Sequence, residues 1–253
     1  MTLSNRKILR TLLCLLAGTL YAVCLSACDA KEPLSENRDA EIESPVIAND
    51  LSNQKVTAIA EDTQGHIWIG TFRGLNKNNV HDYHQYFCTD DSLGLPDNQI
   101  THLLRDSKNR FWVGTVNGVC LYTDKDNFRI IPIEADNKNV RQILEDRNGR
   151  IFLNTGFQLY AYHPREEKIT CVLPEISPGN AFYAQCHIAP DNNLWVMTST
   201  GLRCYDPSTL QLKESVALSG YPYYSYLHNN ELWITGNHTL SIFDTRTHSF
   251  KPL

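Results

Sequence analysis

Residues 61–75 read EDTQGHIWIGTFRGL, and this stretch decides the fold class. Its interior alternates like a β-strand centred on Trp68. Gly65 lies just before that strand and Gly74 just after it, and glycine adopts a positive φ at little cost. The stretch therefore predicts a short strand that has a turn at each end.

The strand centre recurs along the chain as an aromatic residue. Successive centres are 44, 40, 43 and 38 residues apart. The centres are Trp68, Trp112, Phe152, Trp195 and Trp233. Self-similarity at this period is typical of repeat proteins, in which one unit cannot bury its own apolar face and must stack against a neighbour.

A turn position lies three residues before each centre and holds only glycine or asparagine. Its occupants are Gly65, Asn109, Gly149, Asn192 and Asn230. Because both residue types tolerate a positive φ, the position predicts a tight hairpin turn. The position six residues before the centre is Asp62, Asp106 or Asp146 in the first three repeats, where the carboxylate can accept backbone N–H groups. Ala189 and Leu227 replace it in the last two.

Each repeat contains four short β-prone segments, such as VTAIAE at 56–61 before the turn and the segment 128–133 at the end of the second unit. Four antiparallel strands in about 42 residues form one blade of a β-propeller. The sequence therefore predicts an all-β, partial or small β-propeller of about five four-stranded blades over residues 51–253. Their predicted limits are near 51–95, 96–135, 136–178, 179–218 and 219–253. We expect an open or imperfect arc, with exposed edges.

The N-terminal 27 residues are predicted to be a lipoprotein signal peptide. Positive residues at 6, 7 and 10 precede the apolar segment 11–24, which is short for a span of about 30 Å of hydrocarbon. LSAC at 25–28 resembles a bacterial lipobox, which implies cleavage before Cys28 and lipid attachment to it. An uncleaved signal anchor is the alternative, and both place the protein outside the cytoplasm. Residues 28–50 are expected to form the lipidated cysteine and a flexible tether.

Composition argues against several functions. The net charge of -5 gives no nucleic-acid footprint. Five cysteines lie beyond Cys28 with no CxxC spacing, so we expect small buried side chains rather than a zinc site. His81 and His84 would point to opposite faces of a strand, which makes a shared metal unfavourable. We expect no cofactor, no metal, no catalytic residue and no enzyme activity in this chain.

The repeat resembles the two-component regulator propeller repeat, which has the form V-x-x-I-x-E-D-x-x-G-x-I-W-I-G-T-x-x-G-L. The first unit matches it almost throughout, from Val56 to Leu75, the second matches well, and the last three match in part. Members of this family form the extracytoplasmic sensors of hybrid histidine kinases in gut Bacteroidetes. The resemblance implies a periplasmic sensor that responds to oligosaccharides released from complex glycans.

The chain also departs from that family, whose sensors have more repeats and continue into membrane, kinase and receiver parts. Here five repeats are found, and no phospho-acceptor or nucleotide-binding pattern follows them. We therefore expect a ligand-sensing propeller without the kinase parts, as a fragment or truncated form. The alternative is a stand-alone, lipid-anchored propeller that binds a glycan or a protein, and a propeller lyase or hydrolase is the last possibility. A homodimer is a further possible partner arrangement.

Ligand-binding candidates lie in the turns between the second and third strands and in the loops that join blades, all of which gather around the axis of a propeller. Aromatic, arginine and amide side chains suit sugars, whose faces stack on rings and whose hydroxyls bond polar groups. The candidates are Phe72, Arg73, Asn117, Tyr221 and His238. Tyr221 opens YPYYSYL at 221–227, the densest aromatic run, which is also explained as an innermost strand packed between blades.

Overall fold

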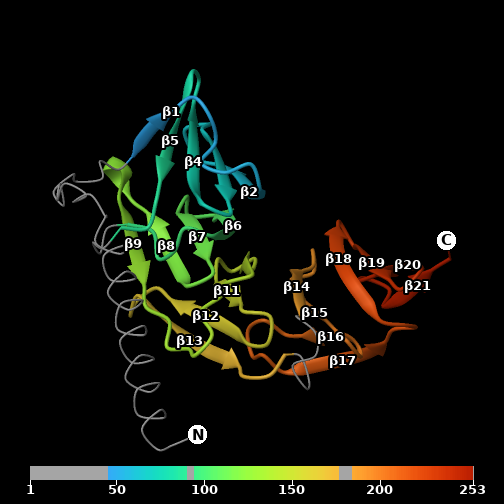
Figure 1. Cartoon of the computed structure of the whole chain (residues 1–253). Helices are drawn as coiled ribbons and strands as arrows, with labels where there is room; N and C mark the ends of the chain where they lie inside the picture. The colour runs from blue at the N-terminus through green and yellow to red at the C-terminus, as the bar shows by residue number, and fades with distance from the viewer. Residues whose placement is uncertain (1–44, 90–93, 177–183, 253) are drawn as a thin grey trace, which may run out of the picture. The chain divides into compact units, whose positions relative to one another are not determined.

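The computed structural model describes residues 45–89, 94–176 and 184–252, which belong to one compact unit (Figure 1). The predicted signal peptide, Cys28 and most of the predicted tether lie outside these residues. No helix in the described part of the chain has the length and apolar character needed to cross a membrane.

The described residues form five antiparallel sheets, drawn in sequence from blue to red in Figure 1. The first has the strand order β1-β5-β4-β3-β2, and each of the others runs in chain order. Sheet one contains β1 (Val46–Ala48), β2 (Val56–Glu61), β3 (Ile67–Thr71), β4 (Gly74–Asn79) and β5 (Asp82–Tyr86). Sheet two contains β6 (Ile100–Arg105), β7 (Phe111–Thr115), β8 (Gly118–Tyr122) and β9 (Phe128–Ile131), with the 3-10 helix η1 (Asp124–Asp126) before β9.

The remaining sheets each contain four strands. Sheet three contains β10 (Gln142–Glu145), β11 (Ile151–Asn154), β12 (Leu159–His163) and β13 (Lys168–Leu173). Sheet four contains β14 (Gln185–Ile188), β15 (Leu194–Thr198), β16 (Gly201–Tyr205) and β17 (Leu212–Ala217). Sheet five contains β18 (Pro222–His228), β19 (Glu231–Gly236), β20 (Thr239–Asp244) and β21 (Ser249–Lys251). The predicted all-β fold of about five blades is confirmed.

The first sheet differs from the prediction in one strand. Val46–Ala48 pair with β5 through Val46 and Gln85, Ile47 and His84, and Ala48 and Tyr83. Residues 46–48 therefore do not belong to the flexible tether expected over residues 28–50, because they join a sheet edge. The added strand occupies backbone groups of β5 that would otherwise form an open edge.

The hairpin turns follow the glycine and asparagine pattern in four of the five repeats. Gly65, Asn109, Gly149 and Asn192 have φ values of 84°, 62°, 72° and 69°. The prediction is wrong for the fifth repeat, where Asn229 has the positive φ of 54° instead of Asn230. There His228 pairs directly with Glu231, so the turn contains only two residues and its left-handed position moves.

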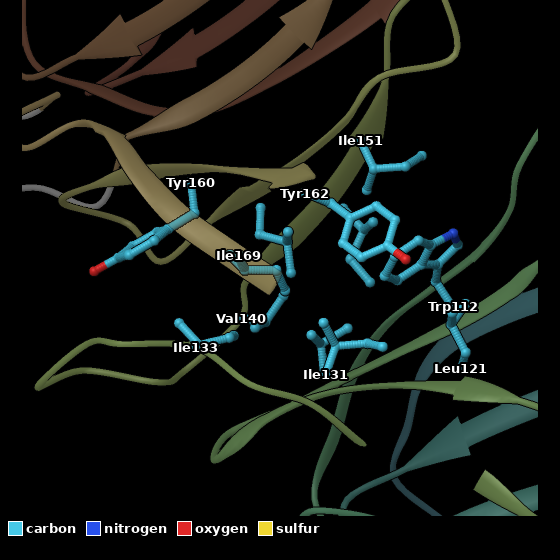
Figure 2. Close-up of a cluster of buried hydrophobic side chains, with 12 residues drawn as sticks. Trp112, Leu121, Ile131, Ile133, Val140, Ile151, Tyr160, Tyr162 and Ile169 are labelled. Atoms are coloured by element: carbon cyan, nitrogen blue, oxygen red, sulfur yellow. The ribbon is translucent and has the colours of Figure 1, made fainter. Parts of the chain in front are cut away.

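The sheets pack face to face, each one against the next. We call the face of a sheet that carries its aromatic centre the leading face, and the opposite face the trailing face. Trp112 and Leu121 on the leading face of sheet two meet Ile151 and Tyr162 on the trailing face of sheet three (Figure 2). Trp112 and Tyr162 make an edge-to-face contact at a centroid distance of 4.9 Å. Corresponding apolar clusters join sheets one and two, three and four, and four and five.

Two aspartates connect the turns to the buried aromatic centres. Asp62 Oδ2 accepts Trp68 Nε1 at 2.9 Å, and Asp106 Oδ2 accepts Trp112 Nε1 at 2.8 Å. Their other oxygens accept backbone N–H groups within the turn, as expected. In the fourth repeat Ala189 occupies this position, and buried Trp195 Nε1 has no hydrogen-bond partner among the described residues.

Two predictions about burial need correction. Cys120, Cys186 and Cys204 are buried as expected, but Cys88 and Cys171 are exposed. The stacking of every aromatic centre also fails at the fifth repeat. Trp233 is 36% exposed, because no described sheet covers the leading face that carries it.

Candidate functional site

A cavity of about 500 Å³ lies at the innermost strands of sheets two to five. We call it the inner-strand cavity. Its lining comes from strands β6, β10, β14 and β18 and from the residues just before β10 and β14. The lining residues are His102, Arg141, Gln142, Ala184, Gln185, His187, Tyr224, Ser225 and Tyr226. Four repeats thus contribute to one concave site.

Two glutamines connect the inner strand β10 to β14 and β14 to β18. Gln142 Oε1 accepts Cys186 N at 2.9 Å, and its Nε2 donates to Cys186 O at 3.3 Å. Gln185 Oε1 accepts Ser225 N at 2.7 Å, and its Nε2 donates to the Tyr223 carbonyl at 3.1 Å. An amide supplies both a donor and an acceptor, so it can pair with both groups of a neighbouring backbone. These bonds hold the cavity wall in place.

Two histidines of the lining are held in the neutral form. Burial lowers the pKa of His102 to about 4 and that of His187 to about 4. His102 Nδ1 accepts Ile143 N at 3.3 Å, a role that only an unprotonated nitrogen can perform. His187 Nε2 lies 2.8 Å from Ser225 Oγ. Near neutral pH the cavity therefore presents uncharged imidazoles, amides and a hydroxyl, together with one guanidinium.

Two tyrosines of β18 complete the lining on one side. Tyr224 and Tyr226 are 61% and 58% exposed, so their rings are accessible to a ligand. Exposed rings beside uncharged donors and acceptors suit a ligand that has both apolar faces and hydroxyl groups. The described lining combines these side chains with amides, a serine hydroxyl and imidazoles, all of which can bind such a ligand.

A second cavity, of about 420 Å³, lies between sheets one and two. Asp126 on its wall accepts Tyr86 Oη at 2.6 Å and Tyr122 Oη at 2.9 Å, and Lys77 and Arg105 also line it. Burial alone would raise the pKa of Asp126, but the tyrosine hydrogen bonds outweigh it and lower the pKa. The carboxylate is thus engaged within the protein, which makes this cavity the weaker candidate.

The predicted ligand-binding residues lie in turns rather than in either large cavity. Phe72 and Arg73 form the β3–β4 turn, Asn117 the β7–β8 turn and His238 the β19–β20 turn, and all four are exposed. Tyr221 precedes β18, and its carbonyl accepts Asn237 N at 3.2 Å. In the fifth sheet Tyr221 and His238 therefore lie at the same end of the strands. The assignment of these five residues to a ligand stays a prediction.

Sequence reasoning missed the inner-strand cavity because its residues lie within strands. A signal was present: His102, Gln142 and Gln185 each stand ten residues before an aromatic centre, where an apolar residue would be expected in a buried strand. The aromatic run 221–227 was predicted to include an innermost strand, and β18 (Pro222–His228) is the first strand of its sheet. Its tyrosines at 223, 224 and 226 are nevertheless exposed instead of packed between blades.

One family model and several solved structures are similar to this chain. The family model described as two component regulator propeller matches residues 50–73 and 94–117. No curated protein matches the chain significantly. Among solved structures, virginiamycin B lyase from Staphylococcus aureus is 17% identical with a TM-score of 0.62, over 81% of this chain and 72% of that one. A streptogramin B lyase is 15% identical with a TM-score of 0.62 over the same shares.

A structure described as the extracellular domain of a hybrid two component system from B. thetaiotaomicron is 15% identical, with a TM-score of 0.49. The match covers 79% of this chain but only 36% of that one. At these identities the likeness concerns the fold, and the match to the family model concerns the first two repeats. The chain is a β-propeller protein whose first two repeats match the two component regulator propeller model.

Proposed function

We propose that this chain is the extracytoplasmic, ligand-sensing propeller of a hybrid two-component signalling system, and that it binds an oligosaccharide in the inner-strand cavity. The family of the first two repeats supports the signalling role. The observation that supports the ligand class is a cavity of about 500 Å³ in which exposed tyrosine rings lie beside uncharged polar groups. Such a lining can stack on sugar faces and bond their hydroxyls.

Ligand binding would act on the contacts between sheets. Gln142 and Gln185 both line the cavity and bond to the inner strand of the next sheet. A ligand that engages several inner strands at once would favour one arrangement of these sheets over others, and that difference would be the signal. In this proposal the chain is exported, held at a membrane by lipid on Cys28, and carries out no catalysis itself.

Binding is tested by calorimetry of the full chain against a panel of oligosaccharides from plant and host glycans. We expect Tyr224→Ala and Tyr226→Ala each to weaken the affinity by about tenfold, because each removes one stacking surface. Tyr223→Ala is the matched control, since Tyr223 is also exposed but does not line the cavity. Equal loss in all three variants would contradict the site.

The five turn residues provide the competing location. If Phe72→Ala and Arg73→Ala abolish binding while both cavity variants retain it, the ligand lies at the turns. The fold likeness to two lyases suggests an enzyme as the second candidate. Turnover of any panel glycan by the purified chain, followed by mass spectrometry of the products, would favour that candidate over a sensor.

A further inference from the structure

Exposed apolar side chains gather at the two ends of the series of sheets. Among the described residues, every large exposed apolar side chain except Ile130 and Leu212 lies in or beside sheet one or sheet five. The three middle sheets are covered on both faces by their neighbours. Each of the two terminal sheets is covered by another described sheet on one face only.

The uncovered face of sheet five is its leading face. Tyr226, Trp233 and Ile242 lie in one cross-strand row of this face, and Tyr224, Thr235 and Leu240 in the next. Trp233 is 36% exposed, whereas its counterparts Trp112 and Trp195 are fully buried by the following sheet. The leading face of sheet five therefore carries apolar side chains like those at the contacts between sheets, but no described sheet covers it.

The uncovered face of sheet one is its trailing face. Ile59 pairs with Ile69 and is 65% exposed, and Ile67 is 38% exposed. The position equivalent to Ile59 in the strand pairing of sheets two to five is occupied by buried residues. These are Leu103, Ile143, Cys186 and Ser225. The residues equivalent to Ile67, each directly before its aromatic centre, are likewise buried. They are Phe111, Ile151, Leu194 and Leu232.

These two faces are the two halves of a contact that the chain makes four times. In each of the four contacts, a leading face with its aromatic centre packs on the trailing face of the next sheet. Polar contacts recur as well, since Gln142 and Gln185 each form hydrogen bonds with the inner strand of the next sheet. In sheet five the equivalent strand position is occupied by Tyr224. A partner that presents a trailing face like that of sheet one would continue the series.

We propose that the leading face of sheet five docks on the trailing face of sheet one of a second copy of this chain. Within one chain the two faces are exposed at the same time, so they do not cover each other. A second copy supplies the matching face with the register already used inside the chain. The contact joins two different surfaces, which makes it head-to-tail rather than self-complementary.

The experiment is sedimentation of the full chain over a series of concentrations, in mild detergent because of its apolar N-terminal segment. The wild-type chain is expected to associate reversibly. Ile59→Lys places a charge on the trailing face and Trp233→Lys on the leading face, and each is expected to raise the dissociation constant by about tenfold or more. Neither residue lines the inner-strand cavity, although Trp233 pairs with Tyr226 of its lining. Self-association is therefore measured without any oligosaccharide, and a failure of oligosaccharide binding leaves the result unaffected.

Mixing the two variants distinguishes head-to-tail association from other geometries. Each variant retains one intact face, so a mixture is expected to restore dimers, with a single contact, that neither variant forms alone. Ile130→Lys is the control, since Ile130 is exposed on the middle sheet two. Circular dichroism and thermal unfolding of each variant would verify that the fold is retained.

Three outcomes would overturn the proposal. A wild-type chain that stays monomeric at all concentrations would show that a second copy does not cover these faces. Dimers of either variant alone as stable as the wild type would place the contact elsewhere. A mixture that remains monomeric would exclude head-to-tail pairing.

Discussion

At the scale of single residues, an aspartate connects the turn to the tryptophan beneath it in the first two repeats. Asp106 is almost fully buried, and it accepts Trp112 Nε1 at 2.8 Å and Arg110 Nε at 2.6 Å. The same carboxylate accepts two backbone N–H groups of the turn. A buried acceptor with several donors is costly to remove, because every donor then loses its partner.

Asp106→Ala is therefore expected to lower the free energy of unfolding by about 2–4 kcal/mol, as for other losses of a buried hydrogen-bond network. Urea unfolding followed by tryptophan fluorescence measures the change. Asp136→Ala is the matched control, because Asp136 is exposed. It should alter the free energy of unfolding by less than about 0.5 kcal/mol. Equal effects of the two substitutions would show that the link to Trp112 contributes nothing.

The fourth repeat offers the reverse substitution. Ala189 stands where the first three repeats have aspartate, and buried Trp195 Nε1 has no acceptor among the described residues. Ala189→Asp is expected to supply that acceptor and raise the free energy of unfolding by about 1 kcal/mol. Ala189→Asn is the control for size. A destabilised Ala189→Asp variant would mean that this turn cannot enclose a carboxylate as the others do.

At the scale of strands and sheets, the first two sheets each carry a glycine at the second position after the aromatic centre, where the next sheet packs closely. A Cβ added to Gly70 would lie 2.5 Å from Ile100 Cγ2 in the next sheet. Gly70→Ala is expected to cost about 1–3 kcal/mol of stability through overpacking. The double variant Gly70→Ala/Ile100→Ala should be less destabilised than the sum of the single ones, because the shorter side chain leaves room. Strict additivity in thermal or urea unfolding would refute the contact.

Prediction from sequence succeeded for the strands and failed mainly at the ends of the series. A period of about 42 residues and a strict turn position locate hairpins, because local backbone geometry determines which residues fit there. The pairing of β1 with β5 joins segments far apart in sequence, and no local pattern reports it. The exposure of Trp233 likewise depends on whether a neighbouring sheet is present. The inner-strand cavity was missed because its residues come from four separate repeats.

At the scale of the molecule, the packing of successive sheets buries two histidines in their neutral form. His102 and His187 lie on the innermost strands of sheets two and four, and burial lowers the pKa of each to about 4, from an ordinary value of 6.5. The unfolded chain therefore binds protons that the folded chain does not. The free energy of unfolding is therefore highest above pH 6.5, where both states are neutral at these histidines. It decreases as the pH falls from 6.5 toward 4.

Between pH 7 and pH 5 each histidine is expected to remove about 2 kcal/mol from the free energy of unfolding. Urea unfolding at several pH values measures this slope. Asp62 and Asp126 add little in this range: burial alone would raise the pKa of each, but their hydrogen bonds outweigh it, so both values lie below the ordinary 3.8. The double variant His102→Gln/His187→Gln should flatten the slope, whereas His81→Gln, at an exposed position, should retain it. A wild-type chain equally stable at both pH values, or a double variant with the wild-type slope, would show that these imidazoles are not held neutral by the packing of the sheets.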